Sequence, residues 1–191
     1  MFIGVVWSRS VMVVAMGLFF FSFYFFRSPE RQCPADAIKN GYIIAPADGH
    51  VIDITDDPAF TEGYARKISI FLSVWDVHVQ WAPVEGLVTA VTYFPGAFFR
   101  ANLAKSAQEN EHNDVVIESV SGIIMLRQIA GLIARRICCW VKPGDEVQMC
   151  QKIGMIRFGS RVDLFLPNNT VFNVAVGDRV YGGQTVVARF V

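Results

Sequence analysis

The sequence predicts a mainly β domain with minor α structure, a flattened β-barrel or sandwich, preceded by an apolar N-terminal segment. Three observations support this prediction. The 191-residue chain holds many short runs rich in β-branched residues, and clusters of Pro, Gly, Asp and Asn separate these runs. Only one stretch of the later chain has the composition and length of a soluble helix. The chain length favours a single domain with its own core.

The first element is an uncharged apolar segment at residues 11–26. A helix of that length covers about 24 Å at ~1.5 Å per residue, which is short of a hydrocarbon core of ~30 Å. Extension toward the N-terminus includes Arg9, and Arg27 and Arg31 end the segment. A signal peptide would have a shorter apolar run and a cleavage site of small residues, and a buried core helix is a third reading. We expect residues 1–31 to attach the protein to a membrane, either by spanning it or by dipping into it.

The remaining elements are predicted strands, with one helix among them. The strands are expected at residues 49–54, 67–72, 87–93, 115–120, 123–129, 131–141, 162–166 and 185–190. The soluble helix is expected at 97–109, and the polar stretch at 108–114, which contains His112, reads as a solvated loop. Many short strands with one helix predict a barrel or sandwich.

A weak internal repeat supports the barrel. A Gly-Asp-x-Val turn occurs at residues 144–147 and again at 177–180, each before a predicted strand. Such turns recur in the flattened barrels of biotinyl and lipoyl carrier domains. A carrier needs a lysine at an exposed hairpin tip, and the corresponding stretch, residues 157–161, contains none. A non-enzymatic carrier-like or membrane-tethered β domain is therefore the competing function, and the residues disfavour it.

Charge and cysteine usage narrow the function further. The chain has 17 basic and 17 acidic residues, so net charge gives no reason to expect nucleic-acid binding. The cysteines are Cys33, Cys138, Cys139 and Cys150, with no C-x-x-C pair. They predict free thiols in a reducing compartment. No H-x-x-H or H-E-x-x-H spacing occurs, so we expect no metal site.

Few residues stand out as chemical candidates from the pattern alone. The dipeptide Gly159-Ser160 falls within an expected continuous β stretch at 154–164, where glycine implies a strained or closely approached backbone. The hydroxyl of Ser160 could lie against the Gly159 carbonyl, although a simple turn or bulge is the commoner explanation. His78 follows an apolar strand and reads as a half-buried histidine or an acid–base group. Asp48, in a Pro-Asp-Gly turn, reads as a turn former.

An ordered set of segments spread over nearly the whole chain adds a resemblance. The segments are Phe25-Phe26-Arg27 with Pro29; Ala45-Pro46-Ala47-Asp48-Gly49; Leu72-Ser73 with Asp76-Val77-His78-Val79 and Pro83; Gly86 with Tyr93, Gly96 and Phe98; Asn110-Glu111; Arg127-Gln128-Ile129-Ala130-Gly131 with Ala134-Arg135-Arg136-Ile137; and Arg157-Phe158-Gly159-Ser160-Arg161-Val162-Asp163. In this order they resemble the short form of the phosphatidylserine decarboxylase proenzyme family. No single segment is decisive, but the ordered set is specific.

The resemblance implies a self-cleaving enzyme. Gly159-Ser160 matches the family's cleavage dipeptide, so Ser160 would become a covalent pyruvoyl cofactor. The decarboxylase domain would comprise residues 32–191, and cleavage would divide the protein into two associated chains, a β chain at 1–159 and an α chain at 160–191.

The resemblance also assigns the acid–base residues. His78 matches the family histidine that handles protons, and Asp48 matches its acidic partner. Long members carry a second histidine where this chain has Trp81, so the residue that serves as base for self-cleavage stays open.

The implied reaction is decarboxylation of phosphatidylserine to phosphatidylethanolamine in phospholipid biosynthesis, through a Schiff base to the pyruvoyl group. Partners would be the membrane lipid, the two chains of the precursor and possibly a second copy of the protein. The expected location is the cytoplasmic face of the cell membrane. An archaeal ether-linked lipid fits the same seryl headgroup. A pyridoxal phosphate enzyme is disfavoured, because no lysine lies in a recognisable phosphate-binding setting.

Overall fold

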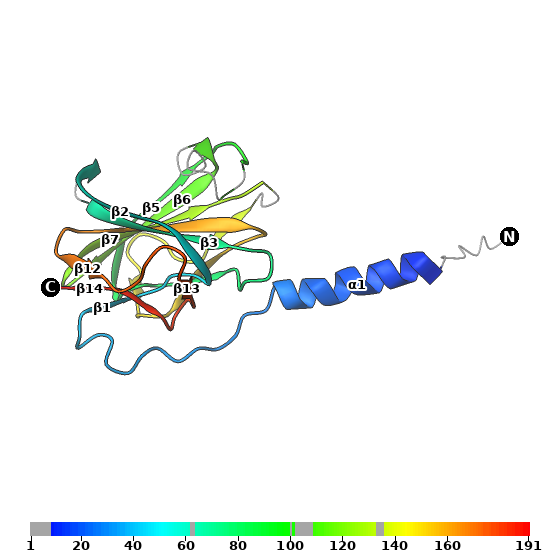
Figure 1. Cartoon of the computed structure of the whole chain (residues 1–191), viewed down its shortest axis with the longest axis horizontal. Helices are drawn as coiled ribbons and strands as arrows, with labels where there is room; N and C mark the ends of the chain where they lie inside the picture. The colour runs from blue at the N-terminus through cyan, green and yellow to red at the C-terminus, as the bar shows by residue number, and fades with distance from the viewer. Residues whose placement is uncertain (1–8, 62–63, 100, 102–108, 133–135) are drawn as a thin grey trace.

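The computed structural model describes residues 9–61, 64–99, 101, 109–132 and 136–191, and one helix projects from a β domain (Figure 1). The elements in chain order are α1 (Arg9–Phe25), β1 (Tyr42–Ile44), β2 (Gly49–Thr61), β3 (Tyr64–Leu72), β4 (Val79–Trp81), β5 (Gly86–Phe94), β6 (His112–Ser119), β7 (Gly122–Ile129), β8 (Ile137–Cys139), β9 (Glu146–Val147), β10 (Lys152–Ile156), β11 (Ser160–Leu166), β12 (Thr170–Phe172), β13 (Arg179–Val180) and β14 (Val186–Phe190). The mainly β prediction is confirmed, and every predicted strand overlaps an observed one. Most of the helix predicted at 97–109 lies outside the described residues.

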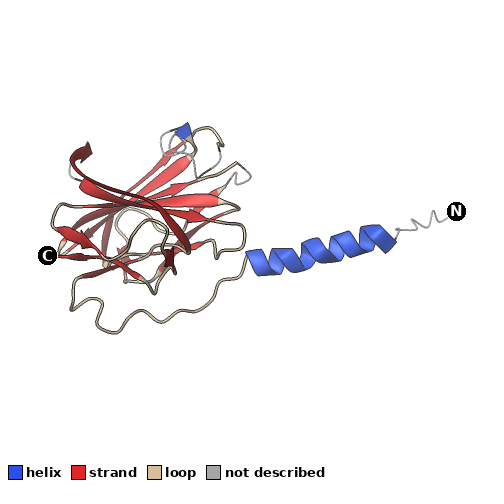
Figure 2. Ribbon diagram, viewed as in Figure 1, coloured by secondary structure: helices blue, strands red, loops and turns tan. Residues whose placement is uncertain are grey.

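The strands form one large and two small antiparallel sheets. The large sheet has the order β13-β2-β3-β11-β7-β6-β5-β9 and curls into a half-barrel (Figure 2). The small sheets are β1-β14-β12 and β4-β10-β8. One buried apolar cluster takes residues from all three sheets, among them Ile70 from β3, Ile153 from β10 and Val187 from β14. The three sheets therefore pack around a shared core and form one domain, with a small second cluster at Val77, Val79 and Trp81.

The internal repeat is confirmed, and its two copies lead into the two outermost strands of the large sheet. Asp145 accepts a hydrogen bond from the backbone N–H of Lys142 at 3.0 Å, and Asp178 accepts one from Ala175 at 2.8 Å. The glycines of the two turns have φ of 94° and 98°, a conformation that favours glycine. Each turn leads into a two-residue strand, β9 or β13, and these strands are the two outermost of the sheet.

Residues 157–159 interrupt the continuous β structure predicted at 154–164, so that prediction is wrong at its centre. β10 ends at Ile156 in a small sheet, whereas β11 begins at Ser160 in the large one. Phe158 has φ of 65°, a left-handed conformation that an extended strand cannot contain. The chain therefore turns a corner between two sheets immediately before Ser160.

The polar stretch around His112 is also different from the prediction of a solvated loop. His112 begins β6 and is 8% exposed, and its ring stacks on Phe94 with centroids 4.7 Å apart. Asp114, two residues later, pairs with Arg127 of the adjacent strand at 2.7 Å. Polar side chains are buried here because neighbouring strands supply their partners.

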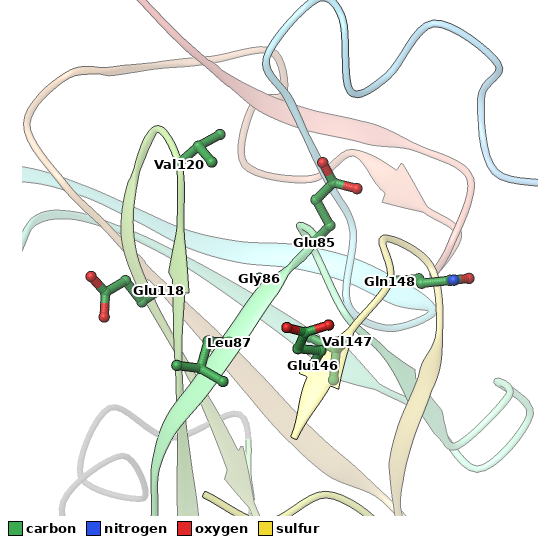
Figure 3. A pocket seen from close by; sticks show the side chains of 8 residues that line it. All are labelled: Glu85, Gly86, Leu87, Glu118, Val120, Glu146, Val147 and Gln148. Atoms are coloured by element: carbon green, nitrogen blue, oxygen red, sulfur yellow. The ribbon is translucent and has the colours of Figure 1, made fainter. Parts of the chain in front are cut away.

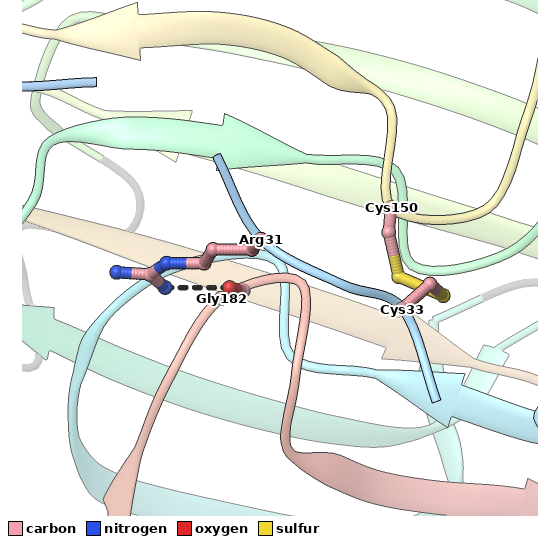
Figure 4. Close-up of a disulfide and its surroundings, with 4 residues drawn as sticks. All are labelled: Arg31, Cys33, Cys150 and Gly182. Carbon is pink, nitrogen blue, oxygen red and sulfur yellow. Dashed lines mark hydrogen bonds between the residues drawn. A yellow bond between two sulfur atoms is a disulfide. The ribbon is translucent and has the colours of Figure 1, made fainter. Parts of the chain in front are cut away.

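The prediction of free thiols is wrong for two cysteines. Cys33 and Cys150 form a disulfide across 117 residues of sequence (Figure 4). Cys138 and Cys139 are not in disulfides. The disulfide ties the linker between α1 and β1 to the turn that precedes β10. Only the fold brings these two distant positions together, so no local sequence motif predicts the disulfide.

Helix α1 extends away from the domain (Figure 1). Apolar side chains are exposed along its length. Its last turn is anchored: Tyr24 Oη and Arg27 Nη2 both donate to the Trp75 carbonyl, at 3.0 and 2.7 Å. The helical part of the N-terminal prediction is confirmed for Arg9–Phe25. Among the described residues, however, the structure contains no helix with the length and hydrophobicity needed to cross a membrane.

Candidate functional site

Several predicted site residues lie at one end of the central strands of the large sheet. Ser160 at the start of β11 pairs with Leu72 at the end of β3, and His50, near the start of β2, pairs with Phe71. On the other side of β11, Arg161 pairs with Ile129 at the end of β7. The segment after β7 therefore lies beside Ser160, whereas the segment before β2, which holds Asp48, lies two strands away, on the far side of β3.

The Gly159-Ser160 peptide sits at the corner between two sheets. Ser160 is fully buried, and among the described residues its Oγ has no hydrogen-bond partner. The strained backbone expected at Gly159 occurs one residue earlier, at Phe158. Among the described residues, a Cβ at Gly159 would meet only the Leu72 carbonyl oxygen, at 3.8 Å, so the position that a side chain would take there is open. A buried hydroxyl without a partner is costly and marks a candidate reactive group.

His78 is held close to this corner by its backbone. Its carbonyl accepts hydrogen bonds from the Ile156 N–H at 3.2 Å and from Gln80 Nε2 at 2.7 Å. Gln80 bonds in turn to Gln128 at 2.9 Å. Gln128 also accepts a bond from Asn113, so a buried amide chain across three sheet positions fixes this segment.

The imidazole of His78 has one satisfied and one free nitrogen. Nδ1 lies 2.9 Å from the carbonyl oxygen of Asp76, so Nδ1 carries the proton because a carbonyl can only accept. Nε2 is buried and has no hydrogen-bond partner in the described part of the chain. Burial lowers the pKa of His78 to about 4, outweighing the bond to Asp76 and the charge of Asp76, which raise it. At neutral pH the ring is uncharged and Nε2 has a free lone pair.

Phe25, at the end of α1, covers both His78 and the corner. It is fully buried, with ring centroids 4.3 Å from His78 and 4.7 Å from Phe158. The helix that projects from the domain therefore ends at the candidate site. Sequence reasoning placed Phe25 in the membrane segment and did not connect it with the site; its position in the Phe-Phe-Arg segment was the available signal.

Asp48 is held by a cation that sequence reasoning did not assign. Both Nη atoms of Arg31 donate to its carboxylate, and the Gly182 N–H donates at 2.9 Å. Arg31 also donates to the Gly182 carbonyl at 2.5 Å (Figure 4). Its guanidinium lies 4.5 Å above the ring of Trp81. Arg31 thus pairs with Asp48 directly over the ring of Trp81.

An open pocket on the large sheet lies away from all of these residues. It has a volume of about 520 Å³ and is lined by Glu85, Gly86, Leu87, Glu118, Val120, Glu146, Val147 and Gln148 (Figure 3). Gly86 begins β5, whereas the opposite end of β5, at Phe94, pairs with the His112 that neighbours Ile129. The pocket is therefore at the far end of the sheet from Ser160.

Comparison with known proteins identifies the family. The sequence profile of the phosphatidylserine decarboxylase family matches residues 18–188. A phosphatidylserine decarboxylase proenzyme from Desulfotalea psychrophila is 47% identical over 174 residues, which cover 90% of this chain and 80% of the relative. This chain belongs to the phosphatidylserine decarboxylase family. Proenzymes of the same name from Burkholderia ambifaria and Burkholderia multivorans are each 44% identical, with the same coverage of both chains.

Family membership confirms the resemblance, and it places the chain in a family of decarboxylases made as proenzymes. The matched region includes the second half of α1, the linker with Arg31 and the corner before Ser160. Everything described above as the candidate site therefore falls inside the part of the chain shared with the family.

Proposed function

We propose that this protein cleaves itself between Gly159 and Ser160, converts Ser160 to a pyruvoyl group and decarboxylates phosphatidylserine to phosphatidylethanolamine. One observation carries the proposal. Among the described residues, the only buried side-chain nitrogen and oxygen atoms without a hydrogen-bond partner are Ser160 Oγ, His78 Nε2 and Arg157 Nε. Two of these belong to the predicted nucleophile and base. Family membership supplies the reaction class.

Self-cleavage begins with attack of Ser160 Oγ on the Gly159 carbonyl carbon. A C–O bond forms, the C–N bond breaks, and the hydroxyl proton moves to the amide nitrogen, which leaves an ester. The neutral Nε2 of His78 suits transfer of that proton, since the low pKa keeps its lone pair free. The left-handed Phe158 and the open space at Gly159 favour the bent peptide that attack requires.

Elimination then separates the chains. Loss of the Ser160 Cα proton breaks the Cβ–O bond, which releases chain 1–159 with a terminal carboxylate and leaves dehydroalanine at residue 160. Water replaces the nitrogen, which departs as ammonia, and a pyruvoyl group remains on chain 160–191. β11 keeps its place between β3 and β7 through hydrogen bonds on both sides, so these ladders hold the two chains together.

Residue 160 would hold the pyruvoyl group, which would supply a ketone able to bind an amine and to act as an electron sink for decarboxylation. We assign His78 to protonation of the product carbon. The carboxylate and phosphate of a bound substrate would raise the low pKa of His78 and so make it a better acid in the complex than in the empty site. His78→Ala should lower decarboxylation per pyruvoyl group by about 10²–10⁴-fold.

We further propose that residues 1–31 attach the enzyme to the cell membrane. α1 is apolar on all sides and exposes large side chains such as Phe19, Phe20 and Phe23, which water does not favour. A lipid-bound α1 would bring the site to the membrane surface, because Phe25 contacts His78. The expectation of the cytoplasmic face now rests on phospholipid synthesis alone, since the Cys33–Cys150 disulfide removes the argument from free thiols.

The direct test of the proposed function is Ser160→Ala. We expect a single uncleaved chain that releases no CO2 from phosphatidylserine vesicles, while Ser160→Cys retains a nucleophile and cleaves slowly. Cleavage of Ser160→Ala at the same bond would remove Ser160 from the reaction. Wild-type protein that cleaves but leaves phosphatidylserine intact would keep the self-processing and reject the substrate.

A further inference from the structure

The backbone of Gly131 lies directly against the carbonyl of Gly159. A Cβ added at Gly131 would stand 2.0 Å from the Gly159 oxygen and 3.1 Å from its carbonyl carbon. Real Cβ atoms essentially never approach another heavy atom closer than 3.0 Å. Gly131 is not among the residues with positive φ, so the contact, and not the backbone conformation, requires glycine here. Gly159 itself has no such requirement, because a Cβ there would approach no described atom closer than 3.8 Å.

The segment that carries Gly131 is fixed from its other side. β7 ends at Ile129 opposite Arg161, and the next residues continue alongside Ser160 and Gly159. Ala130 donates its N–H to the Glu111 carbonyl at 2.9 Å and accepts a bond from Asn110 Nδ2 at 2.7 Å. Ala130 and Asn110 are both buried. Gly131 therefore cannot move far from the Gly159 carbonyl without breaking these bonds.

We infer that Gly131 is a positioning residue for self-cleavage. Its missing side chain leaves the space that the Gly159 carbonyl oxygen occupies. We call this space at Gly131 the seat of the carbonyl, and it orients the carbonyl carbon toward Ser160 Oγ. When Oγ adds, the carbon becomes tetrahedral and the oxygen, which then carries the negative charge, stays in the same seat. The inference rests on the proposed cleavage at Gly159-Ser160.

The role of Gly131 ends when the bond is cut. The Gly159 carbonyl then belongs to the terminal carboxylate of the other chain and takes no part in decarboxylation. A methyl group at residue 131 should displace the carbonyl, and displacements of about 1 Å can slow a reaction ~100-fold. Gly131→Ala should therefore slow cleavage selectively.

The control is Gly86→Ala. A Cβ at Gly86 would meet the Glu118 carbonyl oxygen at 2.3 Å, a similar backbone clash at the far end of the large sheet. Both variants are followed for the appearance of chain 160–191 after synthesis, and thermal unfolding in the uncleavable Ser160→Ala background reports on the fold. We expect Gly131→Ala to fold and to cleave about 100-fold more slowly than wild type, while Gly86→Ala cleaves within about threefold of it.

Material from Gly131→Ala that has cleaved should decarboxylate at the wild-type rate per pyruvoyl group. Three results would overturn the inference: cleavage no slower than in Gly86→Ala, a parallel loss of activity per pyruvoyl group, or failure of Gly131→Ala to fold while Gly86→Ala folds. Each assigns Gly131 to general packing. Absence of cleavage in the wild type would instead reject the proposed function itself.

Discussion

At the scale of single residues, the account depends on a neutral His78. Burial holds its pKa near 4 in the folded protein, whereas an unfolded chain has the ordinary value of 6.5. Between these values the unfolded state binds a proton that the folded state does not. The contribution of His78 to the free energy of unfolding should therefore be fully present above pH 6.5 and should be lost as the pH decreases toward 4. Between pH 7 and pH 4.5 the loss should be about 2–3 kcal/mol.

Chemical unfolding at several pH values in the Ser160→Ala background measures this dependence. His78→Gln is the control, because it retains His50 and His112 and removes only the buried imidazole. The variant should lose most of the slope between pH 4.5 and 6.5. Equal slopes in both proteins would show that His78 titrates normally.

Asp48 and Arg31 form the second feature at this scale. Arg31→Ala leaves a buried carboxylate without its cation, and such losses cost about 3–5 kcal/mol when a pair is well buried. We expect both Arg31→Ala and Asp48→Ala to slow the appearance of chain 160–191, and the double variant to be no slower than the worse single one. Arg31→Lys, which cannot form the two-pronged contact, should be intermediate.

Glu30→Ala is the matched control for the linker, since its ion pair with Lys152 is exposed and should contribute little. The rate at which chain 160–191 appears in each of these variants is measured from time courses on denaturing gels. If Asp48→Ala cleaves at the wild-type rate, Asp48 and Arg31 serve only to hold the linker and the turn.

At the scale of elements, α1 is expected both to attach the protein to the membrane and to cover His78 with Phe25, and truncation can separate these roles. Removal of residues 1–20 deletes most of the exposed apolar side chains of α1 and retains Phe25. Removal of residues 1–26 also deletes Phe25 and so uncovers His78. Both truncated proteins should leave the vesicle-bound fraction in sedimentation, and only the longer truncation should alter cleavage or turnover. Persistent sedimentation of the shorter truncation with vesicles would mean that another surface binds lipid.

The disulfide is the second element-scale feature. It closes a long loop, for which ~2–4 kcal/mol of stabilisation is typical. Cys33→Ser with Cys150→Ser should lower the free energy of unfolding by about that amount, and reducing agent should do the same to wild type. Cys138→Ser with Cys139→Ser should change stability much less, because neither cysteine is in a disulfide and a serine at 139 can keep the hydrogen bond to the Val141 carbonyl. Four reactive thiols in the unreduced protein would contradict the disulfide.

At the scale of the whole molecule, local patterns predicted the strands and the turns that lead into the outermost strands, because β-branched runs and Gly-Asp turns act over a few residues. The ordered motifs identified the family and named Ser160, His78 and Asp48. Contacts between distant positions could not be read this way. The Arg31–Asp48 pair, the Cys33–Cys150 bond and the seat at Gly131 each depend on a linker or strand end that only the folded chain brings into place.

The same limit explains the errors. The sequence around Ser160 is rich in strand-forming residues on both sides, so it reads as continuous β structure, and only tertiary structure shows that the two halves belong to different sheets. The proposed cleavage therefore falls between sheets. Each resulting chain keeps whole strands, which explains how a cut precursor could remain one folded domain.

Intact mass spectrometry of the purified wild-type protein is the most direct test of self-cleavage and pyruvoyl formation at Ser160. The account predicts two polypeptides, one ending at Gly159 and one containing residues 160–191, the latter lighter by one NH3 than its encoded sequence because its first residue is pyruvoyl. A single uncut chain of 191 residues would contradict the account, as would a 160–191 fragment that begins with an unmodified serine.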